Sequence, residues 1–165
     1  MQPTFEEFVT ARGGSLLRFA LMLTGDRHQA EDLVQSVLAK AYVRWARVAA
    51  MGQPEAYLKR VLVNENLRWW RRRSSRETPV AEPGDGPSGV DGAGAYAARE
   101  AAWALLGRLP RRQRAVLVLR YYEDLADAQI AEILGCTPGT VRSQAARALA
   151  TLRAVVPTMD REALP

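Results

Sequence analysis

The segment that most constrains the fold is residues 127–147, where two short amphipathic patterns are joined by a tight turn. Ala131 is small where two helices have to approach closely, and Gly135 can adopt the left-handed backbone that such a turn requires. Val141 is spaced to pack back on the first helix, and Thr137 offers an N-cap hydroxyl to the second. The spacing therefore predicts a helix-turn-helix, a motif that places its second helix in the major groove of DNA.

The second helix of this motif is predicted to be amphipathic. Its apolar positions recur at i, i+4, i+7 and i+11, namely Val141, Ala145, Ala148 and Leu152. The side chains expected to reach the DNA duplex are Thr140, Arg142, Ser143, Gln144 and Arg147. The alternative to a DNA-binding role is an ordinary helical hairpin whose outer face is only solvated.

Composition excludes several classes of protein. The 165 residues carry a formal net charge of +5, which is compatible with a polyanionic partner. We expect neither a membrane span nor a signal peptide, and therefore a cytoplasmic location, because no run approaches about 18 apolar residues. Cys136 and His28 are the only cysteine and histidine, too few for a disulfide or a Cys/His metal site. Without a Ser/His/Asp or paired-carboxylate constellation, we expect no metal, no cofactor and no catalytic residue.

Residues 78–96 are rich in proline and glycine, contain three acids and no base, and have no helical period. We expect them to form a flexible acidic linker between two basic modules, residues 1–77 and residues 97–157, followed by a tail at 158–165. Each module is long enough for a small helical domain but not for a large core. The predicted fold is therefore all-α, with two small helical domains and a helix-turn-helix in the second.

The first module shows helical patterns throughout. We expect an opening helix or helix pair that is broken near Gly13 and Gly14 and ends at the turn 24–26. A longer helix follows, and Pro and Gly in residues 47–54 predict a loop before a further helix that starts near Glu55. The apolar stripe of the longer helix consists of Ala30, Leu33, Val34, Val37, Leu38, Ala41, Tyr42 and Trp45.

The helix that starts near Glu55 interleaves aromatic and basic side chains. Trp69 shares a stripe with Leu58 and Leu62 and is expected to pack inward, whereas Trp70 falls on another side. Rings beside Arg and Lys suit single-stranded nucleic acid, since a basic groove holds phosphates and each stacked base contributes roughly 1–3 kcal/mol. In the alternative, both tryptophans belong to the core and the arginines form a solubilising helix end.

Five short segments of the chain form a recognisable pattern through their order and spacing. They are AEDLVQ at 30–35, AYLKRVLVN at 56–64, the pair WW at 69–70, LPRRQRAVL at 109–117 and TVRSQ at 140–144. Together they resemble the small bacterial RNA polymerase sigma factors of the extracytoplasmic-function group. The tryptophan pair and the end of the chain are most similar to the actinobacterial set known as the sigma-E family.

The resemblance implies partners and roles for the site residues. It implies a non-enzymatic transcription initiation factor that binds core RNA polymerase, through the clamp helices of the largest subunit and through the flap, and promoter DNA as duplex and as single strand. An anti-sigma factor is a further candidate partner. The candidates for polymerase binding are Asp32, Gln35 and Lys40. In the family a flipped base of the minus-10 element is captured beneath a loop, which corresponds here to residues 47–54. The candidates for contacting this element are Lys59, Arg60, Asn64, Arg68, Trp70 and Arg71. The residue pattern of the same helix, independently of the resemblance, suggests Asn64 and Asn66 as amide readers of bases. The resemblance also implies that the recognition helix reads the minus-35 element.

The chain also departs from the family pattern. Many members have a Trp-Leu pair where Tyr57 and Leu58 stand, and Ala-Arg-Asn where residues 62–64 are Leu-Val-Asn. Gln144 occupies a recognition-helix position where relatives often have leucine or histidine, so the family pattern does not give the promoter consensus of this protein.

Two other classes of DNA-binding protein remain open. A dimeric helix-turn-helix repressor or activator would not need the aromatic and basic helix, and a response regulator would need an α/β receiver, for which the first half shows no strand alternation.

Overall fold

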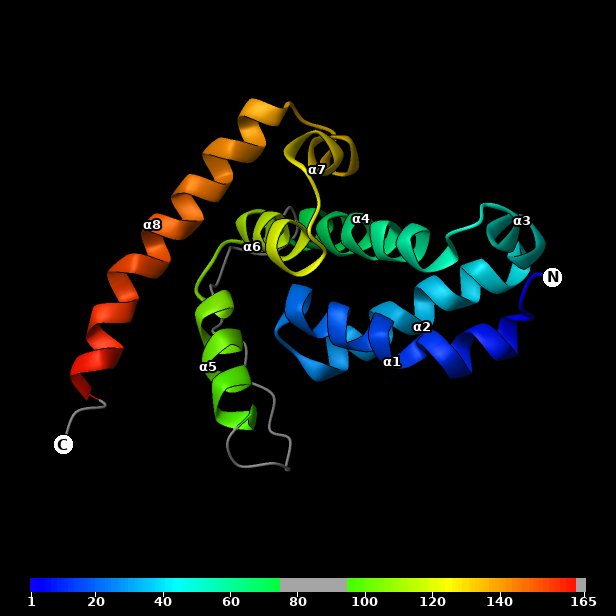
Figure 1. Ribbon diagram of the computed structural model, residues 1–165, viewed down its shortest axis with the longest axis horizontal. Helices are drawn as coiled ribbons and strands as arrows, with labels where there is room; N and C mark the ends of the chain where they lie inside the picture. Colours follow the sequence, from blue (N-terminus) through cyan, green and yellow to red (C-terminus); the bar gives the residue numbers. More distant parts are fainter. Residues whose placement is uncertain (75–94, 163–165) are drawn as a thin grey trace. The chain divides into compact units, whose positions relative to one another are not determined.

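The computed structural model describes residues 1–74 and 95–162 and divides into two compact units, Met1–Glu82 and Pro83–Pro165. Every regular element in the described ranges is helical (Figure 1), so the predicted all-α class with two small helical domains is confirmed. The predicted linker 78–96 lies outside the described residues, except for residues 95 and 96, which begin a helix.

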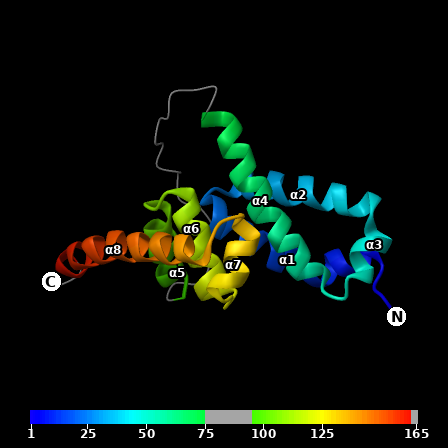
Figure 2. The same ribbon diagram turned by 90° about the horizontal axis from the view of Figure 1, so that it is seen from above.

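The first unit is built from α1 (Phe5–Thr24), α2 (Arg27–Val43), α3 (Trp45–Ala50) and α4 (Pro54–Ser74). Helices α1, α2 and α4 each contact the other two, and α4 crosses the antiparallel pair formed by α1 and α2 (Figures 1 and 2). Their inner faces supply the core: Phe8, Leu16, Phe19, Ala20, Leu23, Ala30, Val34, Val37, Ala41, Leu58, Leu62 and Val63.

Helix α1 continues without interruption through Gly13, so the predicted break there is wrong. A glycine inside a helix costs about 1 kcal/mol relative to alanine. Full burial of one Leu or Phe side chain contributes about 1.5–3 kcal/mol, and Leu16 and Phe19 on the following turns are 1% and 0% exposed. Core packing therefore outweighs the local preference. The helix ends at Gly25, whose φ of 69° lies in the left-handed region and whose N–H donates to the Leu21 carbonyl.

The second helix ends earlier than its apolar pattern predicts. Helix α2 stops at Val43, and the short helix α3 replaces the first part of the loop expected at 47–54. The break at Arg44 lets Trp45 turn toward the start of α1, where its indole Nε1 donates to the Pro3 carbonyl at 3.0 Å and its ring lies 4.9 Å from that of Phe8. The contact between the Trp45 and Phe8 rings thus determines the end of α2 more strongly than the apolar periodicity does.

Tyr42 departs from the same stripe. It was expected inside, yet it is 61% exposed and touches the edge of Phe5, with ring centroids 5.1 Å apart. Helices α1 and α4 supply most of the contacts to α2, with a few from α3, and the buried part of its stripe is narrower than the sequence suggests.

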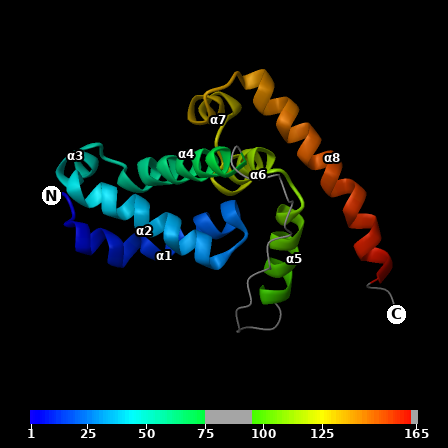
Figure 3. The same cartoon turned by 180° about the vertical axis from the view of Figure 1, so that it is seen from behind.

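The second unit contains α5 (Ala95–Gly107), α6 (Arg111–Leu117), a π-helical turn η1 (Val118–Tyr122), α7 (Asp127–Leu134) and α8 (Pro138–Glu162). Helices α6 and α7 both pack on the first half of α8. Figure 3 shows α7 and α8 joined by a short turn and set at an angle to each other, which confirms the predicted helix-turn-helix. Helix α8 continues to Glu162, into the segment expected to be a tail.

The turn of this motif follows the predicted chemistry. Gly135 has a φ of 66°, and its N–H donates to the carbonyl of Ala131. The Thr137 hydroxyl accepts the backbone N–H of Thr140 at 3.2 Å and caps α8. Val141 is fully buried, as are Ala145 and Ala148 one and two turns later. Local spacing alone was sufficient to predict this part of the fold.

An arginine of α6 ties the second unit together. Arg114 is 7% exposed, and its guanidinium donates to the carbonyls of Leu106, Gly107 and Leu109 at 2.8, 3.3 and 3.4 Å. These carbonyls end α5 and start the next turn, and the Leu106 carbonyl also accepts the Leu109 N–H at 3.1 Å. Burial lowers the Arg114 pKa from its usual value. Two positions earlier, Arg112 donates to the carbonyl of Leu134 at the end of α7.

We expect Arg114→Met to destabilise the second unit by about 2–3 kcal/mol, because the methionine keeps an apolar stem but leaves buried carbonyls without their charged donor. Hydrogen exchange of peptides from α5 and α6 in the full chain measures this local stability. Arg108→Met is the matched control, because Arg108 is exposed. Equal exchange in both variants would show that Arg114 contributes no more than a surface arginine.

Candidate nucleic-acid and protein-binding surfaces

The outer face of α8 carries the residues predicted to contact duplex DNA. Thr140, Arg142, Ser143 and Arg147 are exposed and Gln144 is half-buried, on the side opposite the buried apolar positions. Arg142 and Arg147 form no ion pair with any residue that the structure describes. Both guanidinium groups can therefore bind a phosphate or the edge of a guanine. Thr140 is partly engaged, since its hydroxyl lies 3.0 Å from that of Thr137.

Helix α4 presents a second basic stripe in the first unit. Arg60, Asn64, Arg68 and Arg71 recur at i, i+4, i+8 and i+11 and therefore lie on one face. The three arginines are exposed and Asn64 is half-buried. The core positions Leu58 and Leu62 lie on another face of the helix. The stripe is a continuous row of donors that can follow a sugar-phosphate backbone.

Lys59 lies apart from this stripe, although the sequence grouped it with Arg60. Its side chain is 13% exposed, its Nζ lies 3.3 Å from a Glu55 carboxylate oxygen, and it sits 5.5 Å from the ring centroid of Phe19. Lys59 thus joins α4 to α1. A lysine between a carboxylate and an aromatic ring is less available to a phosphate than the exposed arginines are.

Glu55 is the centre of that junction. Its carboxylate accepts the Ser15 hydroxyl at 2.6 Å and lies 3.4 Å from the Arg12 guanidinium. Burial acts to raise the Glu55 pKa, but the hydrogen bonds from Ser15 and Lys59 and the positive charges of Lys59 and Arg12 outweigh it, so the pKa lies below its usual value. The carboxylate is therefore charged at neutral pH and holds the start of α4 against α1.

The two tryptophans are arranged differently from the prediction. Trp69, expected in the core, is 43% exposed, whereas Trp70 is half-buried. Their rings meet edge to face at 5.1 Å, and the Arg73 guanidinium lies 5.0 Å from the Trp69 ring centroid. The buried positions of α4 end at Asn66, so the last turns of the helix extend past the core that an inward Trp69 would need. Asn66 itself is 3% exposed, which is incompatible with its predicted role as a base reader.

A cavity of about 450 Å³ opens between α2, α3 and α4. Tyr57, which is 37% exposed, stands at its edge. Lys40 and Arg44 supply positive charge on the α2 side. The remaining lining is apolar: Val37, Ala41, Val43, Val48, Leu58 and Val61. The cavity lies beside the segment 47–54, beneath which the family resemblance placed base capture. An aromatic edge, an apolar floor and nearby cations can hold a flat, unpaired base.

The sequence did not assign Tyr57 to this cavity. Its identity was noted only as a departure from the family pattern, because a tyrosine at a helix start does not show which neighbouring helix it faces. The signal available in the sequence is its spacing of i+3 and i+7 to Arg60 and Asn64, which places it on the basic stripe of α4.

The outer face of α2 carries the three residues predicted to bind a protein partner. Asp32, Gln35 and Lys40 are all exposed, on the side opposite buried Val34 and Val37. Lys40 also forms an ion pair with Glu65 of α4, at 3.0 Å, so the exposed face of α2 continues onto α4. Across the described part of the chain, no helix is long and apolar enough to span a bilayer.

Both units match known families. Residues 8–76 match the family described as Sigma-70 region 2, and residues 99–152 match the one described as Sigma-70, region 4. The RNA polymerase sigma-E factor of Streptomyces coelicolor is 38% identical over 159 residues, which span 96% of this chain and 89% of that protein. The ECF RNA polymerase sigma factor SigL of Mycobacterium tuberculosis is 36% identical over 145 residues, spanning 84% of this chain and 80% of the relative.

Solved structures agree on the fold. The sigma factor RpoE of Bartonella quintana, solved in complex with the anti-sigma factor NepR, matches with a TM-score of 0.66 and 24% identity over 93% of this chain and 96% of that chain. CnrH, solved with the cytosolic domain of CnrY, matches with a TM-score of 0.59 and 21% identity over 93% and 88%. Since two sigma-70 regions account for most of the chain, and since relatives named as sigma-E and ECF sigma factors match it nearly end to end, the chain belongs to the extracytoplasmic-function group of the sigma-70 family.

Proposed function

We propose that this protein binds core RNA polymerase and directs it to promoters that have a minus-35 and a minus-10 element, acting by binding rather than by catalysis. The observation that carries the proposal is that each unit presents its own outward basic surface, on α4 in one and on α8 in the other. Two separate DNA elements require two such surfaces. We assign residues 1–77 to polymerase binding and the minus-10 element, residues 97–157 to the minus-35 element, and residues 78–96 to the connection.

The minus-35 element is proposed to lie in duplex form against α8. The positive end of the helix macrodipole and the Thr140 and Ser143 side chains face a phosphate backbone. Arg142 and Arg147 are five residues apart, so they leave α8 at the two sides of this face, and Gln144 lies between them in the sequence. In this arrangement Arg147 reaches a base edge in the major groove, while the first turn of α8 sets the register on the backbone.

The minus-10 element is proposed to bind as a partly single strand along α4. Arg60, Arg68 and Arg71 follow the phosphates, Asn64 reads a base, and a flipped base enters the cavity beside Tyr57. Flipping costs a few kcal/mol, which stacking and phosphate contacts have to offset. Trp70, which is half-buried, supports the C-terminal end of the basic stripe on α4. Lys59 acts indirectly, because it holds α4 on α1.

Core RNA polymerase is proposed to bind the outer face of α2 through Asp32, Gln35 and Lys40. An anti-sigma factor is a further proposed partner, because RpoE of Bartonella quintana, which has a similar fold, was solved in complex with the anti-sigma factor NepR. An inhibitor that covers α2 would compete directly with the polymerase.

Replacing Asp32 and Gln35 together by alanine is expected to weaken binding to core polymerase about 30-fold, since truncated hot spots commonly cost about 2 kcal/mol. Biolayer interferometry with purified core enzyme measures this. The matched control is the Arg27→Ala, Glu31→Ala double variant, which removes an exposed ion pair from the same helix. Equal affinity of the Asp32/Gln35 variant and the wild type, with the same melting temperature, would remove this face from the interface.

Arg147→Ala is expected to relax base preference at one position of the minus-35 element by about 1–3 kcal/mol, the value of a bidentate contact to guanine. Binding of holoenzyme to a library of minus-35 sequences measures the preference. Arg153→Ala is the control, because Arg153 is an exposed arginine further along α8. A uniform loss across all sequences would instead identify Arg147 as a phosphate contact.

Tyr57→Leu is expected to reduce open-complex formation on duplex promoters roughly tenfold, because one stacked base contributes about 1–3 kcal/mol. The defect should shrink on a template that is already unpaired at the minus-10 element and should leave the closed complex intact. Tyr42→Leu serves as the control, since Tyr42 is an exposed tyrosine that does not line the cavity. An equal defect on both templates would argue against base capture at Tyr57.

A further inference from the structure

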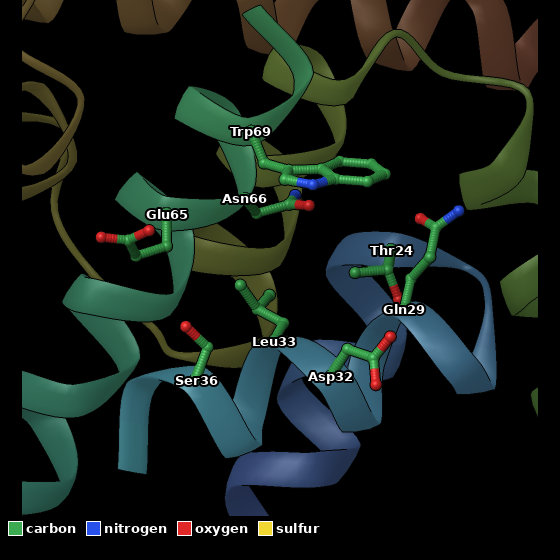
Figure 4. Close-up of a pocket in the computed structure, with 8 residues that line it drawn as sticks. All are labelled: Thr24, Gln29, Asp32, Leu33, Ser36, Glu65, Asn66 and Trp69. Atoms are coloured by element: carbon green, nitrogen blue, oxygen red, sulfur yellow. The ribbon is translucent and has the colours of Figure 1, made fainter. Parts of the chain in front are cut away.

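A second, smaller cavity lies between the start of α2 and the second half of α4, away from the basic stripe. Its volume is about 260 Å³. Figure 4 shows the Trp69 indole projecting from α4 across this cavity, above Asn66, with Asp32 and Ser36 of α2 on the opposite wall. Ligand pockets for small molecules usually measure about 300–1,000 Å³. This one is of a size that suits a single protruding side chain.

The cavity has a negative charge that the protein itself does not neutralise. Of its two carboxylates, Glu65 already pairs with Lys40 at 3.0 Å and lies 3.9 Å from Arg68. Asp32 forms no ion pair within the described ranges 1–74 and 95–162, and its side chain is exposed. The cavity is therefore complementary to a positive charge that approaches from solvent on the α2 side.

The opposite wall offers an aromatic ring with affinity for a guanidinium. A cation within about 6 Å of an aromatic centroid is attracted by the ring, most strongly by tryptophan. Arg73 of the same helix already lies 5.0 Å from the Trp69 centroid. Arg73 follows Trp69 by one turn of α4, whereas Glu65 and Asn66 of the cavity precede it by one turn. Arg73 therefore lies on the C-terminal side of the Trp69 ring, and the cavity lies on its N-terminal side.

We propose that this cavity receives an arginine side chain of the protein that docks on the outer face of α2. The planar guanidinium stacks on Trp69 while it donates hydrogen bonds to the Asp32 carboxylate, a combination that lysine cannot reproduce with its point charge. The inference rests on the proposed function, which makes core RNA polymerase that protein. It assigns Trp69 to protein recognition rather than to the hydrophobic core or to DNA.

The test measures the affinity of full-length variants for purified core RNA polymerase. Asp32→Asn and Trp69→Leu should each weaken binding about tenfold, whereas Trp69→Phe should stay within about threefold because the ring is kept. The double variant should lose about 20-fold rather than the 100-fold product, since both residues act on one partner side chain. Glu31→Gln, which neutralises the neighbouring carboxylate on α2, should bind like the wild type. Melting temperatures show that each variant is folded.

A photocrosslinker identifies the occupant. With p-benzoylphenylalanine in place of His28, an exposed residue one turn before Asp32, the crosslinked polymerase peptide should contain an arginine. Changing that arginine to alanine in the polymerase should weaken the wild type but not the Trp69→Leu variant. A peptide without arginine, additive losses in the double variant, or wild-type affinity in both single variants would overturn the proposal. A wild-type chain that fails to bind core polymerase at all would instead overturn the proposed function.

Discussion

The structure depends on the burial of one face of each long helix, because that burial determines which side chains remain for binding. In α8, Val141, Ala145 and Ala148 are fully enclosed by α6 and α7, so the side that carries Arg147 has to face outward. In α4, the enclosure of Leu62 by α1 and α2 turns Arg68 and its neighbours toward solvent. The proposed recognition surfaces of both units are thus the reverse sides of core-forming stripes.

Positive charge has two separate uses in this protein. Arg114 and Arg112 bind the carbonyls at the ends of α5 and α7, and Lys59 joins α4 to α1 beside Glu55. These cations stabilise the units. Arg147 and the stripe on α4 remain outward and can serve a polyanion. The net charge of +5 therefore overstates the positive charge that is available to DNA. The position of each basic side chain, and not the total charge, determines function.

The end of α4 connects surfaces with different partners. Its outer stripe is proposed to follow single-stranded DNA, while Trp69, on another side, shares a cavity with Asp32 of α2. Glu65 bridges the two sides through its pairs with Lys40 and Arg68. A partner that engages this cavity would contact the same helix that is proposed to hold the minus-10 strand. In this proposal, polymerase binding and DNA binding would meet on one helix without requiring a conformational change.

The sequence by itself determined the features that depend on neighbours within a few residues. The left-handed Gly135, the Thr137 cap and the buried face of α8 followed from local spacing, as did the all-α class. Tertiary structure alone decided the continuity of α1 through Gly13, the exposure of Tyr42 and Trp69, the burial of Asn66 and the capture of Lys59 by Glu55. Each of these depends on how far a neighbouring helix extends and which atoms it brings within contact distance. Helical periodicity gives the direction in which a side chain points, but whether anything covers it is set by the length and packing of elements distant in the chain.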